Sequence, residues 1–370
     1  MRVALRKAWW FRNVRANRVG STHYEAEYYL PMSVRPTRIV LFSGTIALLV
    51  TTILAQTSPW PFPSRSATPA GAWPFPSHSS APAAPAAPAA PAAPVAPGAA
   101  RSPSNILTVA FWNIEWFPGR GPEPANGAEL SQTNAVHAEM NKIEADIVGM
   151  EEVRDFASAA LAVQPLKGFK VDVCANFPPR EGQEHAQEVA IASRLQPLSA
   201  WAEKWKSAGP LTPPRGFAFA AYQVAPRQLA LVYAVHLKSN LGDVSEDIPV
   251  RQESIRQLRS HIDAMEKAYS GVGSITWIIG GDFNTSMDDP QFAQETSMRD
   301  LMAAGFSWGW QNAKPWERVT HPGGGKFPPA SFDHVFFKNA GLRQSRVLNT
   351  SPQASDHHAI MTTLELPAAK

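Results

Sequence analysis

Apolar runs of strand length recur through the C-terminal two thirds of the chain, and several are apolar at successive positions rather than at every second one. A strand that is apolar on both faces is typical of a sheet covered on both sides. We therefore predict buried strands at 106–112, 146–153, 169–175, 188–193, 227–237, 274–283 and 331–337.

Three intervening segments have helical spacing instead. In 250–269, a single helix face would carry Ile255, Leu258, Ile262 and Met265. The segments 132–145 and 289–305 are also predicted helices, the second ending at a glycine. Strands and helices mix without strict alternation, which predicts a layered α/β or α+β domain with helices outside.

The N-terminal region has a different pattern. Residues 39–55 carry no charge, and eight basic residues against two acidic ones precede them in 1–38. A run of this length lies between a signal-peptide core and a membrane-spanning helix, which needs roughly 20 residues. The basic flank predicts a cytoplasmic N-terminus and export of the chain beyond the run. The run is either a cleaved signal or a single transmembrane anchor, and the start is either Met1 or Met32.

Residues 56–104 form a Pro/Ala-rich linker, because 13 of the 34 prolines lie within 57–104. Proline fixes φ and lacks an amide donor, so this stretch is predicted to be an extended spacer. The motif WPFPS occurs in it twice, and we have no physical explanation for the repeat. The folded domain is therefore assigned to 105–370, long enough for its own hydrophobic core.

Charge and cysteine content narrow the functional classes. The net charge is +3, but ten of the basic residues precede residue 105, and the domain holds 24 basic and 29 acidic residues. A mildly acidic domain has no strong general attraction for nucleic acid, so a nuclease would need a local basic groove or divalent cations. The single cysteine, Cys174, excludes an intramolecular disulfide and a zinc site built from several thiolates.

Polar residues interrupt the apolar runs repeatedly at their ends. They are acids, amides and histidines, joined by one lysine: Asn113, Glu115, Glu151, Glu152, His236, Lys238, Asn240, Asp282, Asn284, Asp333, His334, Asp356, His357 and His358. Carboxylate and amide oxygens suit Mg²⁺, with Mn²⁺ or Ca²⁺ as alternatives. Histidine moves protons near neutral pH, and a nearby aspartate orients it. This combination predicts hydrolysis at phosphorus.

Two glycines precede Asp282 and Asn284 in the stretch IIGGDFN. Glycine permits a close approach of the backbone to another group. We expect Gly280 and Gly281 to let a water molecule and a phosphate come close to the end of the strand.

The order of the motifs FWNIEWF, DIVGMEEV, EVAIASR, VHLKSN, GGDFNT, FDHVFF and SDHHAI resembles the endonuclease/exonuclease/phosphatase superfamily over about 107–366. This group includes pancreatic-type deoxyribonuclease, abasic-site endonucleases and neutral sphingomyelinases. The resemblance implies a deoxyribonuclease I-like four-layer sandwich, in which two packed mixed β-sheets are flanked by helices and the site lies at one edge.

The resemblance also implies roles for single residues. Asp282 would orient or deprotonate the attacking water, and Asn284 would bind the phosphate. His357 would contact the scissile phosphate and move a proton, with Asp333 paired to it. His236 would protonate the leaving oxygen, as in deoxyribonucleases and sphingomyelinases.

The implied metal ligands are Glu152, Asn113 and Asp356, with Glu115 as a further acidic candidate. The family usually has glutamine before the metal-binding glutamate, whereas this chain has Glu151 there, so Glu151 and Glu152 compete for the role. Glu188 is a candidate support for His236.

The sequence thus predicts an exported, Mg²⁺-dependent phosphodiesterase, most simply a monomeric nuclease acting on DNA or RNA. A phospholipid or phosphomonoester hydrolase on the same fold is the alternative, and an anchored domain on a spacer would suit a lipid substrate. A third hypothesis, an inactive binding module, would be marked by loss of Asp282, Asn284 or His357, and all three are present.

Overall fold

Most of the predicted domain is described by the structure, a computed structural model that covers residues 105–179, 182–324 and 327–368. The predicted basic segment (1–38), signal or anchor segment (39–55) and proline-rich linker (56–104) lie outside the described residues. Within the part that is described, no helix has the length and apolar character needed to span a bilayer.

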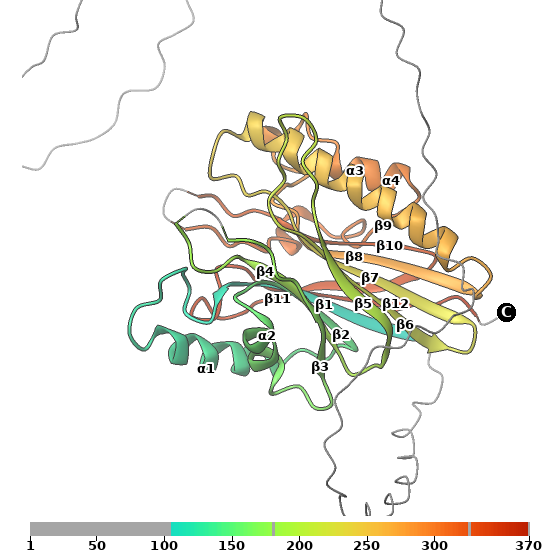
Figure 1. The fold of residues 1–370 in the computed structure, drawn as a ribbon, viewed down its shortest axis with the longest axis horizontal. Helices are drawn as coiled ribbons and strands as arrows, with labels where there is room; N and C mark the ends of the chain where they lie inside the picture. Colours follow the sequence, from blue (N-terminus) through green and yellow to red (C-terminus); the bar gives the residue numbers. More distant parts are fainter. Residues whose placement is uncertain (1–104, 180–181, 325–326, 369–370) are drawn as a thin grey trace, which may run out of the picture. The chain divides into compact units, whose positions relative to one another are not determined.

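Two six-stranded sheets form the centre of the described region (Figure 1). The first sheet contains, in spatial order, β11 (Gly341–Leu348), β12 (Ala359–Glu365), β1 (Ile106–Phe117), β2 (Ile147–Val153), β4 (Glu188–Ser193) and β3 (Lys170–Cys174). The second contains β5 (Pro197–Lys204), β6 (Gly216–Ala225), β7 (Gln228–His236), β8 (Ser274–Asp282), β10 (Asp333–Lys338) and β9 (Ser307–Trp308). Both sheets are mixed, as predicted, because β1–β2 and β7–β8 are parallel and the other pairs are antiparallel.

Helices cover the outer face of each sheet. The first sheet carries α1 (Ala128–Met140) and α2 (Phe156–Val163), and the second carries α3 (Val244–Ala268) and α4 (Ser297–Ala303) (Figure 1). Two short 3₁₀ turns, η1 (Pro290–Phe292) and η2 (Pro315–Glu317), lie in the connections. The result is the predicted four-layer sandwich.

Strand β1 shows why its sequence is apolar on both faces. Val109 and Phe111 belong to the core between the sheets, whereas Ala110 and Trp112 belong to the core beneath α1 and α2. Side chains alternate across a strand, so a strand with a core on each side needs an apolar residue at every position.

The structure corrects the bounds of two predicted helices. The segment 289–305 is not one helix, because it divides into η1 and α4 around Glu295, whose carboxylate turns inward to the buried Arg251. Helix α3 begins before Pro249, because Asp243 caps it by accepting the amide N–H of Ser245 (2.8 Å).

The topology brings distant polar residues to one edge. Parallel strands end at the same edge of a sheet, and here the carboxyl ends of β7 and β8 place His236 opposite Asp282. Strand β10 runs antiparallel to β8, so its first residue, Asp333, also lies opposite Asp282. In the first sheet the ends of β1 and β2 meet the start of β12 in the same way.

Candidate active site

The Asp282 carboxylate lies at the centre of a cluster of polar side chains. We name this cluster the hub; it consists of Asp282, Asn113, Asn284, His236 and His357. Oδ1 of Asp282 accepts the backbone N–H of Asn284 (2.8 Å), and its Oδ2 accepts the side-chain amides of Asn113 and Asn284 (3.0 Å each). The Nε2 atoms of His236 and His357 lie 3.5 and 3.9 Å from the same Oδ2. One carboxylate oxygen from the second sheet therefore faces two histidines and two amides.

Asp282 titrates unusually in this environment. Its side chain is 2% exposed, and burial raises its pKa to about 7, against the opposing effect of the His357 charge. A carboxylate with a pKa near neutrality is a stronger base than an ordinary aspartate. Asp282 is thus suited to accept a proton from a water molecule.

His357 is fixed by the partner that the sequence predicted. Its Nδ1 lies 2.7 Å from Asp333 Oδ2, and Asp333 N–H donates to Thr320 Oγ1 (3.0 Å). Burial opposes protonation of the imidazole, but the charges of Asp333 and Asp282 outweigh it and raise the pKa of His357 well above its ordinary value. The two carboxylates thus favour the charged form of His357, whose Nε2 lies 3.9 Å from Asp282 Oδ2.

The structure separates the roles of Glu151 and Glu152. Glu152 has a left-handed backbone (φ 61°), accepts the side-chain amide of Asn113 (3.2 Å) and lies 3.6 Å from His236. Glu151 is fully buried between the sheets, and neither of its oxygens has a hydrogen-bond partner among the described residues. Glu152 is therefore the carboxylate that faces the site.

The expectation about Gly280 and Gly281 is wrong. A Cβ on Gly280 would meet the ring of Phe111 at 2.3 Å, and one on Gly281 would meet Val235 O at 2.1 Å and Glu151 Oε1 at 2.7 Å. Both glycines are required because groups of the protein core fill the space above them. They permit close packing of the sheets and do not admit substrate.

Of the remaining predicted metal ligands, Asn113 contacts Glu152 directly, and the charge of Asp356 acts on it. Asn113 donates to Glu152 and Asp282, and its Oδ1 accepts the Glu115 N–H (3.0 Å). Glu115 pairs with Arg120 (2.7 Å) and accepts the Asp356 N–H (3.1 Å). The Asp356 side chain is 48% exposed and opens to solvent.

These residues fit a divalent cation. Burial raises the pKa of both Glu152 and Asp282, which shows that their negative charges lack full compensation within the protein. A hard cation with oxygen ligands would supply the missing charge, and an exposed Asp356 leaves it an entry path. Glu152 and Asp356 are the carboxylates that would hold it, with Asn113 fixing Glu152.

Several other polar residues serve the fold. Lys238 is bound to Asp247 (2.7 Å), and buried His334 contacts Thr285 O (3.0 Å), as expected for a structural histidine. Trp308 and Trp310 are buried and belong to the hydrophobic core, whereas Trp316 is 70% exposed.

The predicted role of Glu188 was to support His236. In the structure its carboxylate accepts the Phe177 backbone N–H (2.9 Å). Burial raises its pKa to about 7. Between its ordinary pKa and 7 the folded state binds more protons than the unfolded state, so this group lowers stability as pH rises through that window.

Replacing Glu188 by glutamine should therefore raise the free energy of unfolding at pH 8 by roughly 1 kcal/mol or more, with a much smaller gain at pH 5. The glutamine oxygen can still accept the Phe177 N–H, so the packing is preserved. Urea unfolding at both pH values measures the difference. An equal gain at the two pH values would show that the carboxylate charge is not the cause.

Sequence reasoning missed a buried chain of contacts that holds Asn284. Arg251 on α3 is fully buried, pairs with Glu295 (2.7 Å) and donates to Asn240 Oδ1 (2.7 Å). Asn240 Nδ2 in turn donates to the Asn284 carbonyl (2.6 Å). The helical pattern of α3 could have flagged Arg251, because an arginine among the buried positions of a helix needs an ionic partner.

Arg251→Met should destabilise the protein by roughly 3–5 kcal/mol, because Glu295 would remain buried without its cation. Arg256→Met on the same helix is the matched control, since Arg256 is 64% exposed in its pair with Glu253. That change should cost less than about 1 kcal/mol. Denaturant unfolding compares the two, and similar losses would mean that burial of the pair does not decide its contribution.

A second residue missed by sequence reasoning is His321, in the loop before β10. Its ring lies 5.1 Å from that of His357, centroid to centroid, and its Nε2 is 3.9 Å from Asp356 Oδ2. No strand pattern surrounds it in the sequence, so no signal placed it at the site.

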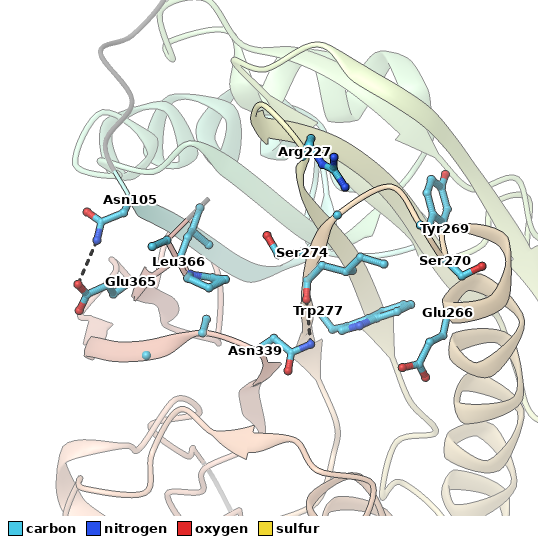
Figure 2. Close-up of a pocket in the computed structure, with 17 residues that line it drawn as sticks. Asn105, Arg227, Glu266, Tyr269, Ser270, Ser274, Trp277, Asn339, Glu365 and Leu366 are labelled. Atoms are coloured by element: carbon cyan, nitrogen blue, oxygen red, sulfur yellow. Dashed lines mark hydrogen bonds between the residues drawn. The ribbon is translucent and has the colours of Figure 1, made fainter. Parts of the chain in front are cut away.

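A hollow of about 1090 Å³ lies at the other end of β8 and is separate from this site. Arg227, Ser274 and Trp277 line it, together with Asn339 and Asn105 (Figure 2). The two asparagines already donate to Ile275 O and Glu365 Oε1 (3.0 Å each). None of the predicted site residues lines this hollow, so its size does not mark the chemistry.

Comparison with known proteins agrees with the fold. The sequence profile of the Endonuclease/Exonuclease/phosphatase family matches residues 110–357. A comparison with curated proteins finds no match.

Solved structures show the same fold at low identity. They include an endonuclease/exonuclease/phosphatase from Beutenbergia cavernae, 17% identical with a TM-score of 0.55, covering 71% of this chain and 72% of that one. A family protein from Bacteroides thetaiotaomicron is 14% identical with a TM-score of 0.52, covering 71% and 96%. Truncated TDP2 from Caenorhabditis elegans is 15% identical with a TM-score of 0.51, covering 71% and 100%.

The matched profile spans every strand end that contributes to the hub, from Asn113 to His357. The two six-stranded sheets and their flanking helices are those of the deoxyribonuclease I-like fold. The chain therefore belongs to the endonuclease/exonuclease/phosphatase family of metal-dependent phosphoric ester hydrolases.

Proposed function

We propose that this protein is an exported, Mg²⁺-dependent phosphodiesterase that cleaves nucleic acid. The observation that carries the proposal is the position of Asp282 Oδ2, which faces His236 at 3.5 Å and His357 at 3.9 Å. A diester leaving group departs as a poor alkoxide, so its hydrolysis needs both a base for water and an acid for the leaving oxygen. In this arrangement the Asp282 carboxylate provides the base, and His236 provides the acid.

Each residue of the hub has one part in the reaction. Asp282 takes a proton from the attacking water while the water oxygen bonds to phosphorus. The bond between phosphorus and the leaving oxygen breaks in the same step. His236 gives a proton to that oxygen. His357, held as an imidazolium by Asp333, neutralises charge on the phosphate. The Asn284 amide donates to Asp282 Oδ2 at 3.0 Å and to Leu237 O at 3.3 Å, and it would exchange the longer of these bonds for one to the phosphate. A bound Mg²⁺ at Glu152 and Asp356 would add Lewis-acid polarisation of the phosphoryl oxygen.

Export and the monomeric state are proposed from the sequence alone. The uncharged run 39–55 behind a basic segment supports translocation of the domain, which would then act outside the cytoplasm, either released or anchored.

A phospholipid substrate is the second candidate, favoured by apolar side chains in loops around the site. Leu241, next to Asn240, is 80% exposed, Phe327 in the His321 loop is 50% exposed, and Trp316 is 70% exposed. A lipid surface would contact these side chains if they form one contiguous apolar patch, since patches and not single exposed residues mark such contact.

One experiment separates these substrates. The full chain is incubated with Mg²⁺ and, in parallel, with supercoiled plasmid DNA, sphingomyelin vesicles and p-nitrophenyl phosphate, each with an EDTA control. The proposal expects plasmid cleavage that EDTA abolishes. Phosphocholine release alone would replace it with the lipid function, and nitrophenol release alone with a phosphomonoesterase. No reaction with Mg²⁺ or Mn²⁺ would contradict a hydrolytic function on these ester classes.

A further inference from the structure

His321, Asp356 and His357 form a cluster at the mouth of the site, which we name the rim triad. One ligand atom from each residue lies within 4.8 Å of the other two. The three residues come from two segments, the loop before β10 and the turn that precedes β12, and these segments are more than thirty positions apart in the sequence. The triad is distinct from the proposed magnesium carboxylates, although it shares Asp356 with them.

The donor set of the rim triad differs from that of a magnesium site. It offers two imidazole nitrogens and one carboxylate oxygen, whereas Mg²⁺ prefers oxygen ligands alone. Two histidines and a carboxylate are the ligands of many zinc sites that keep a fourth position open. Imidazole also raises the affinity for the later transition metals. The triad therefore discriminates in favour of Zn²⁺ and against Mg²⁺.

The surroundings of His357 match those of a metal-binding histidine. Its Nδ1 is engaged by Asp333 Oδ2 at 2.7 Å, so Nε2 is the nitrogen that can bind a metal, and Zn²⁺ must displace the proton from it. A carboxylate behind the imidazole is the usual support of a zinc-bound histidine, because it fixes the ring and increases its basicity.

His321 is held in place through its backbone. Its N–H donates to Ala330 O (2.9 Å), and the Ala330 N–H donates back to His321 O (2.8 Å). The preceding residue, Thr320, accepts the His358 N–H at its carbonyl (2.7 Å). The loop is thus tied to the segment that carries His357, and the two imidazoles are positioned before any metal arrives.

The rim triad is also accessible. The exposed fractions of the side chains are 48% for Asp356, 16% for His321 and 9% for His357. Within the described residues, His321 Nδ1 is buried and has no hydrogen-bond partner, so no hydrogen bond through that nitrogen fixes the ring against the small rotation that ligation requires.

We propose that the rim triad binds Zn²⁺ and that this zinc inhibits the enzyme. A metal on His357 Nε2 occupies the atom that would contact the phosphate, and it draws Asp356 away from the magnesium side. The inhibitory part rests on the proposed phosphodiester hydrolysis, whereas zinc binding does not depend on it.

Binding is tested first, by isothermal titration of the full chain with ZnCl₂ at several fixed Mg²⁺ concentrations, because the two metals compete for Asp356. The wild type should bind one Zn²⁺, and His321→Asn should weaken that binding by at least about tenfold. His358→Asn is the matched control, because His358 is the adjacent histidine and contacts Thr350 instead. It should leave the affinity unchanged. His321→Gln serves as a second variant, and thermal unfolding verifies that each variant is folded.

Inhibition is tested on the same proteins with the substrate that the wild type cleaves. With the rate of each variant in Mg²⁺ alone as its own reference, His321→Asn should require at least about tenfold more zinc than the wild type for half inhibition. Zinc binding of equal strength in wild type and both His321 variants would overturn the inference. If zinc binds at the triad but no ester is hydrolysed, the site stands and the proposed function fails. If esters are hydrolysed and zinc inhibits all variants alike, the function stands and the inference fails.

Discussion

Replacing His357 by alanine is expected to lower kcat for phosphodiester hydrolysis by about 10²–10⁴-fold. The Nδ1 atom of His357 is bound to Asp333 at 2.7 Å, and its Nε2 lies 3.9 Å from the Asp282 carboxylate. The substitution removes the imidazolium that stabilises charge on the phosphate, and it leaves Asp333 buried and unpaired. We expect the loss mainly in kcat, since this charge stabilisation is largest in the transition state.

Steady-state kinetics on folded protein measure the effect. His357→Gln keeps a hydrogen-bond donor near Asp333 but cannot carry the charge, so it should be nearly as inactive as the alanine variant. His137→Ala is the control, because His137 lies on α1 and contacts Leu161 O, away from the hub. A His357 variant within threefold of the wild-type rate would remove this residue from the mechanism.

Glu152→Gln should abolish most Mg²⁺ binding and the activity that depends on it, whereas Glu151→Gln should retain both. Glu152 faces Asn113 and His236, while Glu151 points between the sheets toward Gly281. Both changes replace one carboxylate by its amide at neighbouring positions, so the pair differs only in location. Loss of a direct ligand should weaken Mg²⁺ binding by more than about tenfold.

Isothermal titration with MgCl₂ and hydrolysis rates measured over a range of Mg²⁺ concentrations distinguish the two variants. Glu151→Gln should also be at least as stable as the wild type, since it removes a buried carboxylate that no described residue hydrogen-bonds. Equal loss of Mg²⁺ binding in both variants would mean that the metal is held by the pair together and not by Glu152.

The strand ends that form the hub could be predicted because each belongs to a short local motif. GDFN places Asp282 and Asn284 two residues apart after a buried strand, and SDHH places His357 before another. Alternation along a strand was not sufficient to separate Glu151 from Glu152. Glu152 has a left-handed backbone and lies where the pairing of β2 with β4 is irregular, between Glu151 and Val153, and a pattern of apolar residues carries no information about φ.

Contacts between distant segments could not be predicted in the same way. Arg251 reaches Asn284 through Asn240, and His321 reaches His357 across a loop, so neither pair shares a local pattern. Among the strands, β6 (Gly216–Ala225) was missed because four of its ten residues are alanines, which have a low preference for strands. Helix α2 was missed because its sequence is apolar at nearly every position and therefore shows little helical periodicity.

The edge where β1, β2, β8 and β12 meet is assigned as a divalent-metal centre, and the position of a bound metal is the strictest test of that assignment. Crystals of the protein grown with Mn²⁺ would locate the ion by its anomalous scattering. We expect the ion beside the Glu152 and Asp356 carboxylates, with Glu151 outside its coordination. An ion bound elsewhere, or none at this edge at saturating Mn²⁺, would contradict the assignment of the site.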